Sequence, residues 1–241
     1  MTTTVDWSSY GAVLFDLDGV LTPTAEIHER AWAELFAPWD FTPADYLTYV
    51  DGRPRYDGVQ TFLAARGVEL PWGDATDPPG DATVCALGNR KNELFNTVLA
   101  RDGIAPYPGS VAVLDLLDEA GVPAAVVSSS RNARVVLAAA GLTHRLPVVV
   151  DGLTAVDEHL PGKPDPAMFL HAAALLDVAP SRAIVVEDAV SGVAAGAAGN
   201  FAFVLGVDRA RPPASNAAAL AAAGADAVVG DLADTLAGAT S

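Results

Sequence analysis

Cysteine is almost absent from this chain, since Cys85 is the only one among 241 residues. A single cysteine excludes an internal disulfide and any metal site built from several thiolates. The first residues also lack the basic segment followed by an apolar run that marks a secretory signal. These absences fit a reducing compartment, and we expect a cytoplasmic protein.

Positive charge is scarce as well, because 14 lysine and arginine residues face 30 acidic ones and the formal net charge is −16. Such a surface repels a phosphate backbone, so we expect no nucleic-acid partner. The longest uncharged stretch, residues 189–207, is interrupted by Ser191, Asn200 and several glycines. We therefore expect no membrane-spanning segment. The 51% of hydrophobic residues suffices for a large buried core, and we expect a monomer.

Lysine is the rarest basic residue, since arginine supplies twelve of the 14 positive charges and the lysines are Lys91 and Lys163. A chain that otherwise uses arginine has little general need for lysine. Both positions are therefore candidates for chemistry that needs a compact ammonium group. The alternative is an accident of biased composition, which is harder to dismiss for Lys91 than for Lys163.

Two acidic residues end a short apolar run near the amino terminus, in the sequence Val-Leu-Phe-Asp-Leu-Asp-Gly of residues 13–19. The apolar part predicts a buried strand, and Asp16 and Asp18 could project to the same side as the chain leaves the sheet. A divalent cation could then bind between the two carboxylates. The simpler alternative is that Asp18 and Gly19 only form a turn.

The hydrophobic pattern divides the chain into two regions. Apolar strands without polar alternation, joined by helices, predict a doubly wound parallel α/β sheet. We expect its strands at residues 12–15, 124–127, 148–150, 183–186, 201–205 and 227–229. The region after the first strand shows only helical patterns, near residues 24–36, 43–50, 56–66 and 82–101. We therefore expect an α/β core domain at 1–23 and 106–241, with a helical cap domain inserted at 24–105.

Four loops that carry polar side chains follow predicted strands. Besides Asp16 and Asp18, they hold Ser128 to Asn132, Lys163, and the pair Glu187 and Asp188. Because ligands of parallel sheets bind at the carboxyl ends of strands, these loops should converge. Together they offer carboxylates for a hard cation, and a hydroxyl and an ammonium group for phosphate oxygens.

These motifs resemble those of the haloacid dehalogenase superfamily of phosphotransferases along essentially the whole chain. The resemblance implies that Asp16 is a nucleophile that forms an aspartyl-phosphate and that Asp18 is a general acid and base. It also implies that Asp16, Asp18, Glu187 and Asp188 hold Mg²⁺, and that Lys163 binds the transferring phosphoryl group together with Ser128.

Within the superfamily, the segments at 24–32, 90–92 and 128–132 resemble those of β-phosphoglucomutases. A mutase must also hold the distal phosphate of its sugar phosphate, and we expect Arg55 to bind it, with Arg53 as the competing choice. Both arginines could instead be solvated loop residues. Further residues implied in substrate binding are Thr24, His28, Lys91, Ser130, Arg131 and Asn132.

The expected reaction is the interconversion of β-D-glucose 1-phosphate and glucose 6-phosphate through a glucose 1,6-bisphosphate intermediate. The first alternative is a sugar-phosphate phosphatase, in which water accepts the phosphoryl group from Asp16. The second is a phosphosugar-binding protein without turnover, against which the intact acidic residues argue.

Overall fold

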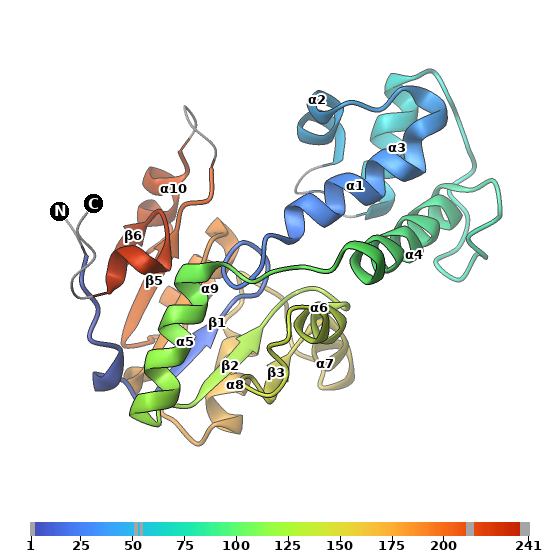
Figure 1. Cartoon of the computed structure of the whole chain (residues 1–241). Coiled ribbons are helices and arrows are strands. Elements are labelled where there is room, and N and C mark those ends of the chain that lie inside the picture. The colour runs from blue at the N-terminus through green and yellow to red at the C-terminus, as the bar shows by residue number, and fades with distance from the viewer. Residues whose placement is uncertain (1–2, 51–52, 54, 211–214, 237–241) are drawn as a thin grey trace. The chain divides into compact units, whose positions relative to one another are not determined.

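The chain divides into two compact units in a computed structural model that describes residues 3–50, 53, 55–210 and 215–236 (Figure 1). The first, which we call the core unit, comprises residues 1–23 and 104–241. The second, which we call the inserted unit, comprises residues 24–103. The inserted unit therefore interrupts the core unit directly after its first strand.

A parallel sheet lies at the centre of the core unit. Its strands in the described residues are β1 (Ala12–Phe15), β2 (Ala124–Val127), β3 (Val148–Val150), β4 (Ala183–Glu187), β5 (Phe203–Val207) and β6 (Ala227–Val229). They pair in the order β3-β2-β1-β4-β5-β6, with every neighbouring pair parallel. The winding direction reverses between β1 and β4, where ligands of such sheets bind. This topology confirms the predicted doubly wound fold.

Helices cover both faces of the sheet because its strands are apolar on both sides. All four residues of β1 are fully buried. On one face, Leu14, Val127 and Val185 pack in a single cluster with α8 (Ala167–Leu175), α9 (Val190–Ala198) and α10 (Ala217–Ala222). Figure 1 shows α5 (Pro108–Ala120) in front of the strands and α8 behind them. Because both faces of the sheet are covered, polar side chains that bind a ligand have to come from the loops at the ends of the strands.

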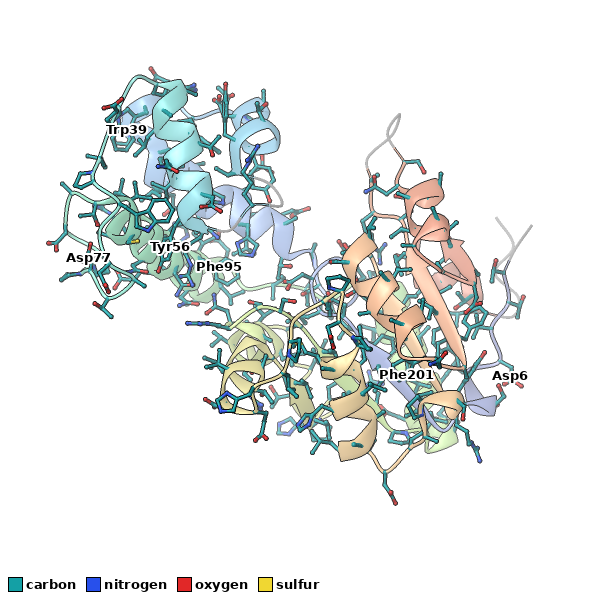
Figure 2. The ribbon with its side chains drawn as sticks, turned by 180° about the vertical axis from the view of Figure 1, so that it is seen from behind. Asp6, Trp39, Tyr56, Asp77, Phe95 and Phe201 are labelled. Carbon is teal, nitrogen blue, oxygen red and sulfur yellow. The ribbon has the colours of Figure 1, made fainter. Side chains whose placement is uncertain are left out.

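The inserted unit is helical and has its own aromatic core. Its helices are α1 (Thr24–Phe36), α2 (Pro43–Asp45), α3 (Arg55–Ala65) and α4 (Val84–Asp102). The rings of Phe36 and Phe62 lie 4.1 Å apart between centroids, and Trp32 stacks on Phe36 at 5.3 Å. Figure 2 shows the unit with its side chains, among them Trp39, Tyr56 and Phe95. A helical unit inserted after the first strand is therefore confirmed.

Two sequence-based expectations for the core unit need correction. The predicted strand at 201–205 lies two residues too early, since β5 is Phe203–Val207. Asn200 has a φ of 53° and turns the chain, and Phe201 packs against Phe169 before strand pairing begins. The second correction is a helix that was not expected, α7 (Gly152–Asp157). Asp151 begins this helix, because its Oδ1 accepts hydrogen bonds from the backbone of residues 153 and 154.

In the inserted unit, the helix predicted over 43–50 is α2 followed by a π-helical turn, Tyr46–Val50. Between this segment and α3, Asp51, Gly52 and Pro54 lie outside the described residues. Within the described part of the chain, no helix combines the length and the apolar character needed to cross a lipid bilayer.

Candidate active site

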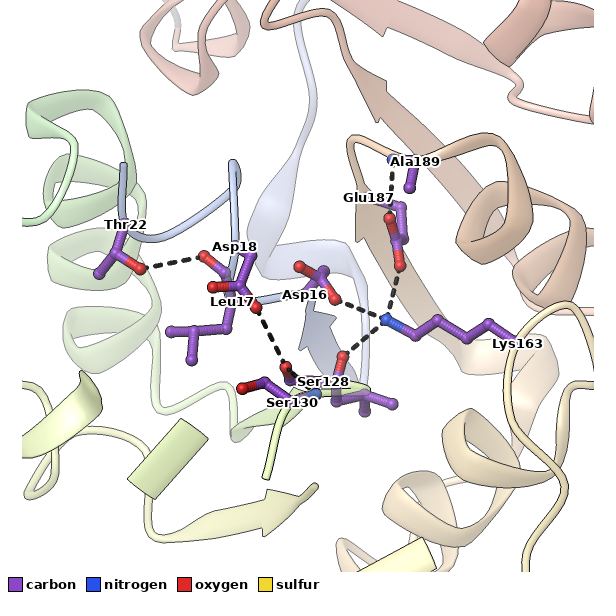
Figure 3. Close-up of polar contacts among 10 residues, drawn as sticks. Asp16, Leu17, Asp18, Thr22, Ser128, Ser130, Lys163, Glu187 and Ala189 are labelled. Atoms are coloured by element: carbon purple, nitrogen blue, oxygen red, sulfur yellow. Dashed lines mark hydrogen bonds and ion pairs between the residues drawn. The ribbon is translucent and has the colours of Figure 1, made fainter. Parts of the chain in front are cut away.

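Asp16 and Asp18 lie in the loop that leaves the carboxyl end of β1 (Figure 3). The N–H of Asp16 still donates to a backbone carbonyl of β4 at 2.9 Å. The chain then turns, and the N–H of Gly19 donates to the carbonyl of Thr22 at 2.9 Å. Gly19 has a φ of +81°, and a β-carbon there would lie 1.9 Å from Oδ2 of Asp188. The loop therefore needs glycine both for its conformation and for its approach to Asp188.

Lys163 is the cation of this site, and its side chain is only 5% exposed. Its Nζ donates to Oδ1 of Asp16 at 2.5 Å, to Oε1 of Glu187 at 2.6 Å and to the carbonyl of Val127 at 2.8 Å. All three protons of the ammonium group thus have an acceptor. Burial alone would lower the pKa of Lys163, but the charges of Asp16 and Glu187 outweigh burial and raise it. Lys163 therefore stays charged and holds one oxygen of Asp16 in place.

Three carboxylates gather beside Lys163. Asp16, Glu187 and Asp188 each offer a ligand atom, and these atoms lie within 4.8 Å of one another. Burial, followed by the charge of Asp16, raises the pKa of Glu187 to about 7. Burial and the charges of Asp16, Glu187 and Asp18 raise the pKa of Asp188 to about 8. Lys163 alone therefore does not balance the negative charge of the cluster. An all-oxygen donor set with excess negative charge fits a hard divalent cation such as Mg²⁺.

The loop after β2 brings hydroxyl groups to the same edge of the sheet. Ser128 is fully buried, and its Oγ makes a long contact of 3.4 Å to Oδ2 of Asp18. The same Oγ accepts from the N–H of Ser130 at 3.1 Å, and Oγ of Ser130 accepts from the N–H of Asn132 at 3.1 Å. These bonds shape the loop, in which Arg131 is exposed and Asn132 is half-buried. The core unit therefore brings the hydroxyl of Ser128 next to Asp18, and Ser130 follows in the same loop.

His28 and Lys91 lie together in the inserted unit, on α1 and α4. Nζ of Lys91 contacts Nδ1 of His28, and it lies 5.2 Å from the ring centroids of both Trp32 and Phe95. Burial, the charge of Lys91 and the charge of Arg55 lower the pKa of His28 to about 3. His28 is therefore neutral at physiological pH, and Lys91 lies between a neutral imidazole and aromatic rings.

Two other expected substrate residues begin helices of the inserted unit. Thr24 is fully buried at the first position of α1, and Arg55 is half-buried at the first position of α3. The guanidinium carbon of Arg55 lies 5.6 Å from the ring centroid of Tyr56, and Arg53 is exposed. In the inserted unit, the charges of Lys91 and Arg55 both act on His28. In the core unit, Lys163 lies among the acidic residues.

Arg209 is a residue of the core site that the sequence pattern did not indicate. Its Nε donates to the carbonyl of Gly19 at 2.7 Å, and its Nη1 donates to Oδ2 of Asp231 at 2.6 Å. Arg209 lies two residues beyond the end of β5, so the rule that sites form at strand ends could have found it. The misplaced end of the predicted fifth strand hid that signal.

Known proteins similar to this chain share its fold and much of its sequence. A family model described as haloacid dehalogenase-like hydrolase matches residues 10–200. A β-phosphoglucomutase of Mycobacterium bovis is 49% identical over 240 residues, which cover 93% of this chain and 91% of that protein. Hexitol phosphatase A of Escherichia coli is 31% identical over 191 residues, 77% of each chain. A solved haloacid dehalogenase family hydrolase of Deinococcus radiodurans, with bound phosphate and sodium, has a TM-score of 0.72 and 30% identity over 94% of this chain and 93% of that one.

The fold, the site and these relatives define the class of protein. The chain is an enzyme of the phosphotransferase or hydrolase class. It belongs to the haloacid dehalogenase-like hydrolase family, whose model covers most of its length. The resemblance predicted from the strand-end motifs is thereby confirmed.

Proposed function

We propose that the protein is a Mg²⁺-dependent phosphosugar mutase that interconverts β-D-glucose 1-phosphate and glucose 6-phosphate. The observation that carries this proposal is the 49% identity to a β-phosphoglucomutase over 93% of the chain. So long a match must include most of the inserted unit, which accounts for residues 24–103. The likeness therefore extends beyond the core fold that mutases and phosphatases of the family have in common.

Asp16 is the nucleophile of the proposed reaction. A carboxylate oxygen of Asp16 bonds to phosphorus as the bond from phosphorus to the sugar oxygen breaks, which gives an aspartyl-phosphate. Asp18 donates its proton to the departing sugar oxygen and recovers a proton from the next attacking hydroxyl. Lys163 supports the role of Asp16, because its bond to Oδ1 restrains the nucleophilic carboxylate.

Asp16, Glu187 and Asp188, together with the backbone carbonyl of Asp18, would hold Mg²⁺. When bound, the cation lowers the repulsion between an anionic phosphate and an anionic nucleophile. Lys163 adds a second positive charge beside the transferring group, and Ser128 offers it a hydroxyl. In a chain with a net charge of −16, this local cancellation is a condition for binding phosphate at all.

A complete cycle needs two transfers through the same aspartate. Phosphorylated Asp16 gives its phosphoryl group to the 6-hydroxyl of β-glucose 1-phosphate while Asp18 takes the proton of that hydroxyl. The bisphosphate then reorients so that its 1-phosphate faces Asp16. Its 1-phosphoryl group passes to Asp16 as Asp18 protonates the oxygen on C1. Glucose 6-phosphate leaves, and Asp16 is phosphorylated again.

The mutase also needs a group that holds the second phosphate while the first reacts. We assign this role to Arg55 of the inserted unit, and we assign Ser130, Arg131 and Asn132 of the core unit to substrate binding. His28, Lys91 and Thr24 complete the proposed substrate set. The charges of Lys91 and Arg55 support this assignment, because both lower the pKa of His28 and so form a positive region of the inserted unit.

A primed assay tests the proposal. The purified protein with Mg²⁺ and a trace of glucose 1,6-bisphosphate should convert β-glucose 1-phosphate to glucose 6-phosphate. A coupled dehydrogenase that oxidises glucose 6-phosphate measures the rate. The α-anomer should not be converted, and Asp16→Asn should abolish turnover.

A sugar-phosphate phosphatase is the second candidate function. It is favoured by the 31% identity to hexitol phosphatase A and by the hydrolase family model. Predominant release of inorganic phosphate from the sugar phosphate would support the phosphatase and contradict the mutase. No turnover of any phosphate ester would contradict both and favour a binding protein.

A further inference from the structure

The turn that carries Asp18 is closed by a backbone hydrogen bond from the N–H of Gly19 to the carbonyl of Thr22 at 2.9 Å. Gly19 has a φ of +81° and no side chain that could pack. The side chain of Asp18 contacts Oγ of Ser128 in the next loop at 3.4 Å. Glycine permits many backbone conformations, so contacts from other loops to the backbone of this turn help to hold Asp18 in position.

Three successive carbonyl groups of the turn are held by the rest of the core unit. The carbonyl of Val20 accepts from Oγ of the fully buried Ser110 at 2.7 Å, and the carbonyl of Leu21 accepts from the N–H of Tyr107 at 2.9 Å. The carbonyl of Gly19 accepts from Nε of Arg209 at 2.7 Å. Of these three bonds, the one from Arg209 comes nearest in sequence to Asp18 and is the one made by a charged donor.

Arg209 is itself fixed from several sides, and its side chain is 19% exposed. Nη1 donates to Oδ2 of Asp231 at 2.6 Å and to the carbonyl of Gly230 at 3.1 Å. The guanidinium carbon lies 3.8 Å from the ring centroid of Tyr107, a stacking distance. Asp231 is held in turn, because its Oδ1 accepts from the N–H of Ala233. The guanidinium group therefore presents Nε from a rigid support.

We propose that Arg209 is a positioning residue that fixes the Asp18 turn through the carbonyl of Gly19. Arg209 follows β5 and Gly19 follows β1, so the side chain links loops of strands that are separated in the sheet by β4. It acts through the backbone of the turn and not on the substrate. This inference rests on the proposed role of Asp18 as the acid and base of the reaction.

Leaving-group dependence separates a positioning role from general support of the fold. Transfer to or from a sugar hydroxyl needs the proton carried by Asp18, whereas nitrophenolate leaves from p-nitrophenyl phosphate without protonation. A displacement of about 1 Å in a reacting group costs about 100-fold. Loss of the Arg209 bond should therefore reduce the reaction of the sugar phosphate about 10- to 100-fold and that of p-nitrophenyl phosphate much less.

The experiment measures kcat/KM for β-glucose 1-phosphate in the primed assay and kcat/KM for p-nitrophenyl phosphate by nitrophenolate release. Arg209→Met should lower the ratio of the two at least about fivefold. Arg209→Lys, which keeps the charge for Asp231 but lacks the Nε donor, should lower it in the same direction. The lysine variant decides the question if the methionine variant does not fold.

Arg145→Met is the matched control. Arg145 is a core-unit arginine whose side chain is 22% exposed, and it pairs with Asp115 at 2.8 Å and with Asp118 at 2.6 Å, both on α5. The Arg145→Met variant should be less stable, but the ratio of its two kcat/KM values should stay unchanged. Equal losses for both substrates in the folded Arg209 variant would overturn the inference and leave Arg209 a structural residue.

Asp18→Asn distinguishes failure of the inference from failure of the proposed function. If Asp18→Asn lowers the ratio and the Arg209 variants do not, the positioning role is wrong and the role of Asp18 stands. If Asp18→Asn leaves the ratio unchanged, the proposed role of Asp18 is wrong, and the inference about Arg209 falls with it.

Discussion

Replacement of Lys163 by methionine should expose the charge imbalance of the acidic cluster. Lys163 is 5% exposed and bonds to Asp16 and Glu187 at 2.5 and 2.6 Å. Removal of one partner of a buried ion pair costs about 3 to 5 kcal/mol, because the remaining charge stays buried without compensation. We expect a loss of this size in the free energy of unfolding at pH 8 without Mg²⁺. For a chain of this length, each kcal/mol corresponds to roughly 2–4 °C in Tm.

The cost of Lys163→Met should depend on pH. The native pKa values of Glu187 and Asp188, about 7 and about 8, lie above their ordinary values of 4.5 and 3.8. A carboxyl group whose pKa is raised by folding favours the native state at low pH and loses that contribution as pH rises through its native pKa. At pH 5 both groups are protonated, so Lys163 balances mainly Asp16 and its removal should cost less than at pH 8.

Urea unfolding in EDTA at pH 5 and pH 8 measures both quantities, and a second substitution checks their cause. Lys163→Met combined with Glu187→Gln should recover much of the loss at pH 8, because it removes the carboxylate left without a partner. A loss below about 1 kcal/mol at pH 8, or an equal loss at both pH values, would refute the view that Lys163 neutralises this cluster.

Three further outcomes can be measured on the same protein. At 100 times its Kd at pH 8, Mg²⁺ should stabilise the protein by about 2.7 kcal/mol, measured as a rise in Tm. The same Mg²⁺ concentration should raise Tm less at pH 5, because the protons on Glu187 and Asp188 compete with the cation. An equal effect at both pH values would contradict this. Gly19→Ala should cost about 1–3 kcal/mol and weaken Mg²⁺ binding at least about tenfold by calorimetry, because its β-carbon would lie 1.9 Å from Oδ2 of Asp188. Gly67→Ala, with a φ of +69° and nothing within 4 Å, should show only the strain and leave Mg²⁺ binding unchanged. Arg55→Ala should lower mutase turnover about 10- to 100-fold and hydrolysis of p-nitrophenyl phosphate far less, and equal losses would exclude it as the distal phosphate ligand.

Local pattern predicted much of the core fold. Uninterrupted apolar runs between helical segments indicated a parallel sheet, and five of the six strands begin where the pattern placed them. The prediction failed at Phe201, where an apolar residue extends the strand pattern but its side chain belongs to the packing beside Phe169. It also missed α7, a short helix that depends on one side chain, Asp151, for its start.

The candidate site was readable for a related reason. Asp16, Lys163, Glu187 and Asp188 are unusual residue types at the ends of strands or in the loops that follow them, and parallel sheets gather such loops at one edge. The sequence alone therefore determined the fold class, the family resemblance and the acidic residues with their lysine. These depend on residue order and spacing, which are local properties.

Only the tertiary structure decided how those residues act on one another. The three acceptors of Lys163, the raised pKa values of Glu187 and Asp188, and the bond from Arg209 to the turn of Asp18 all join segments far apart in the chain. Hydrogen-bond geometry and desolvation depend on distances of a few ångströms between such segments, and no periodicity along the sequence encodes them.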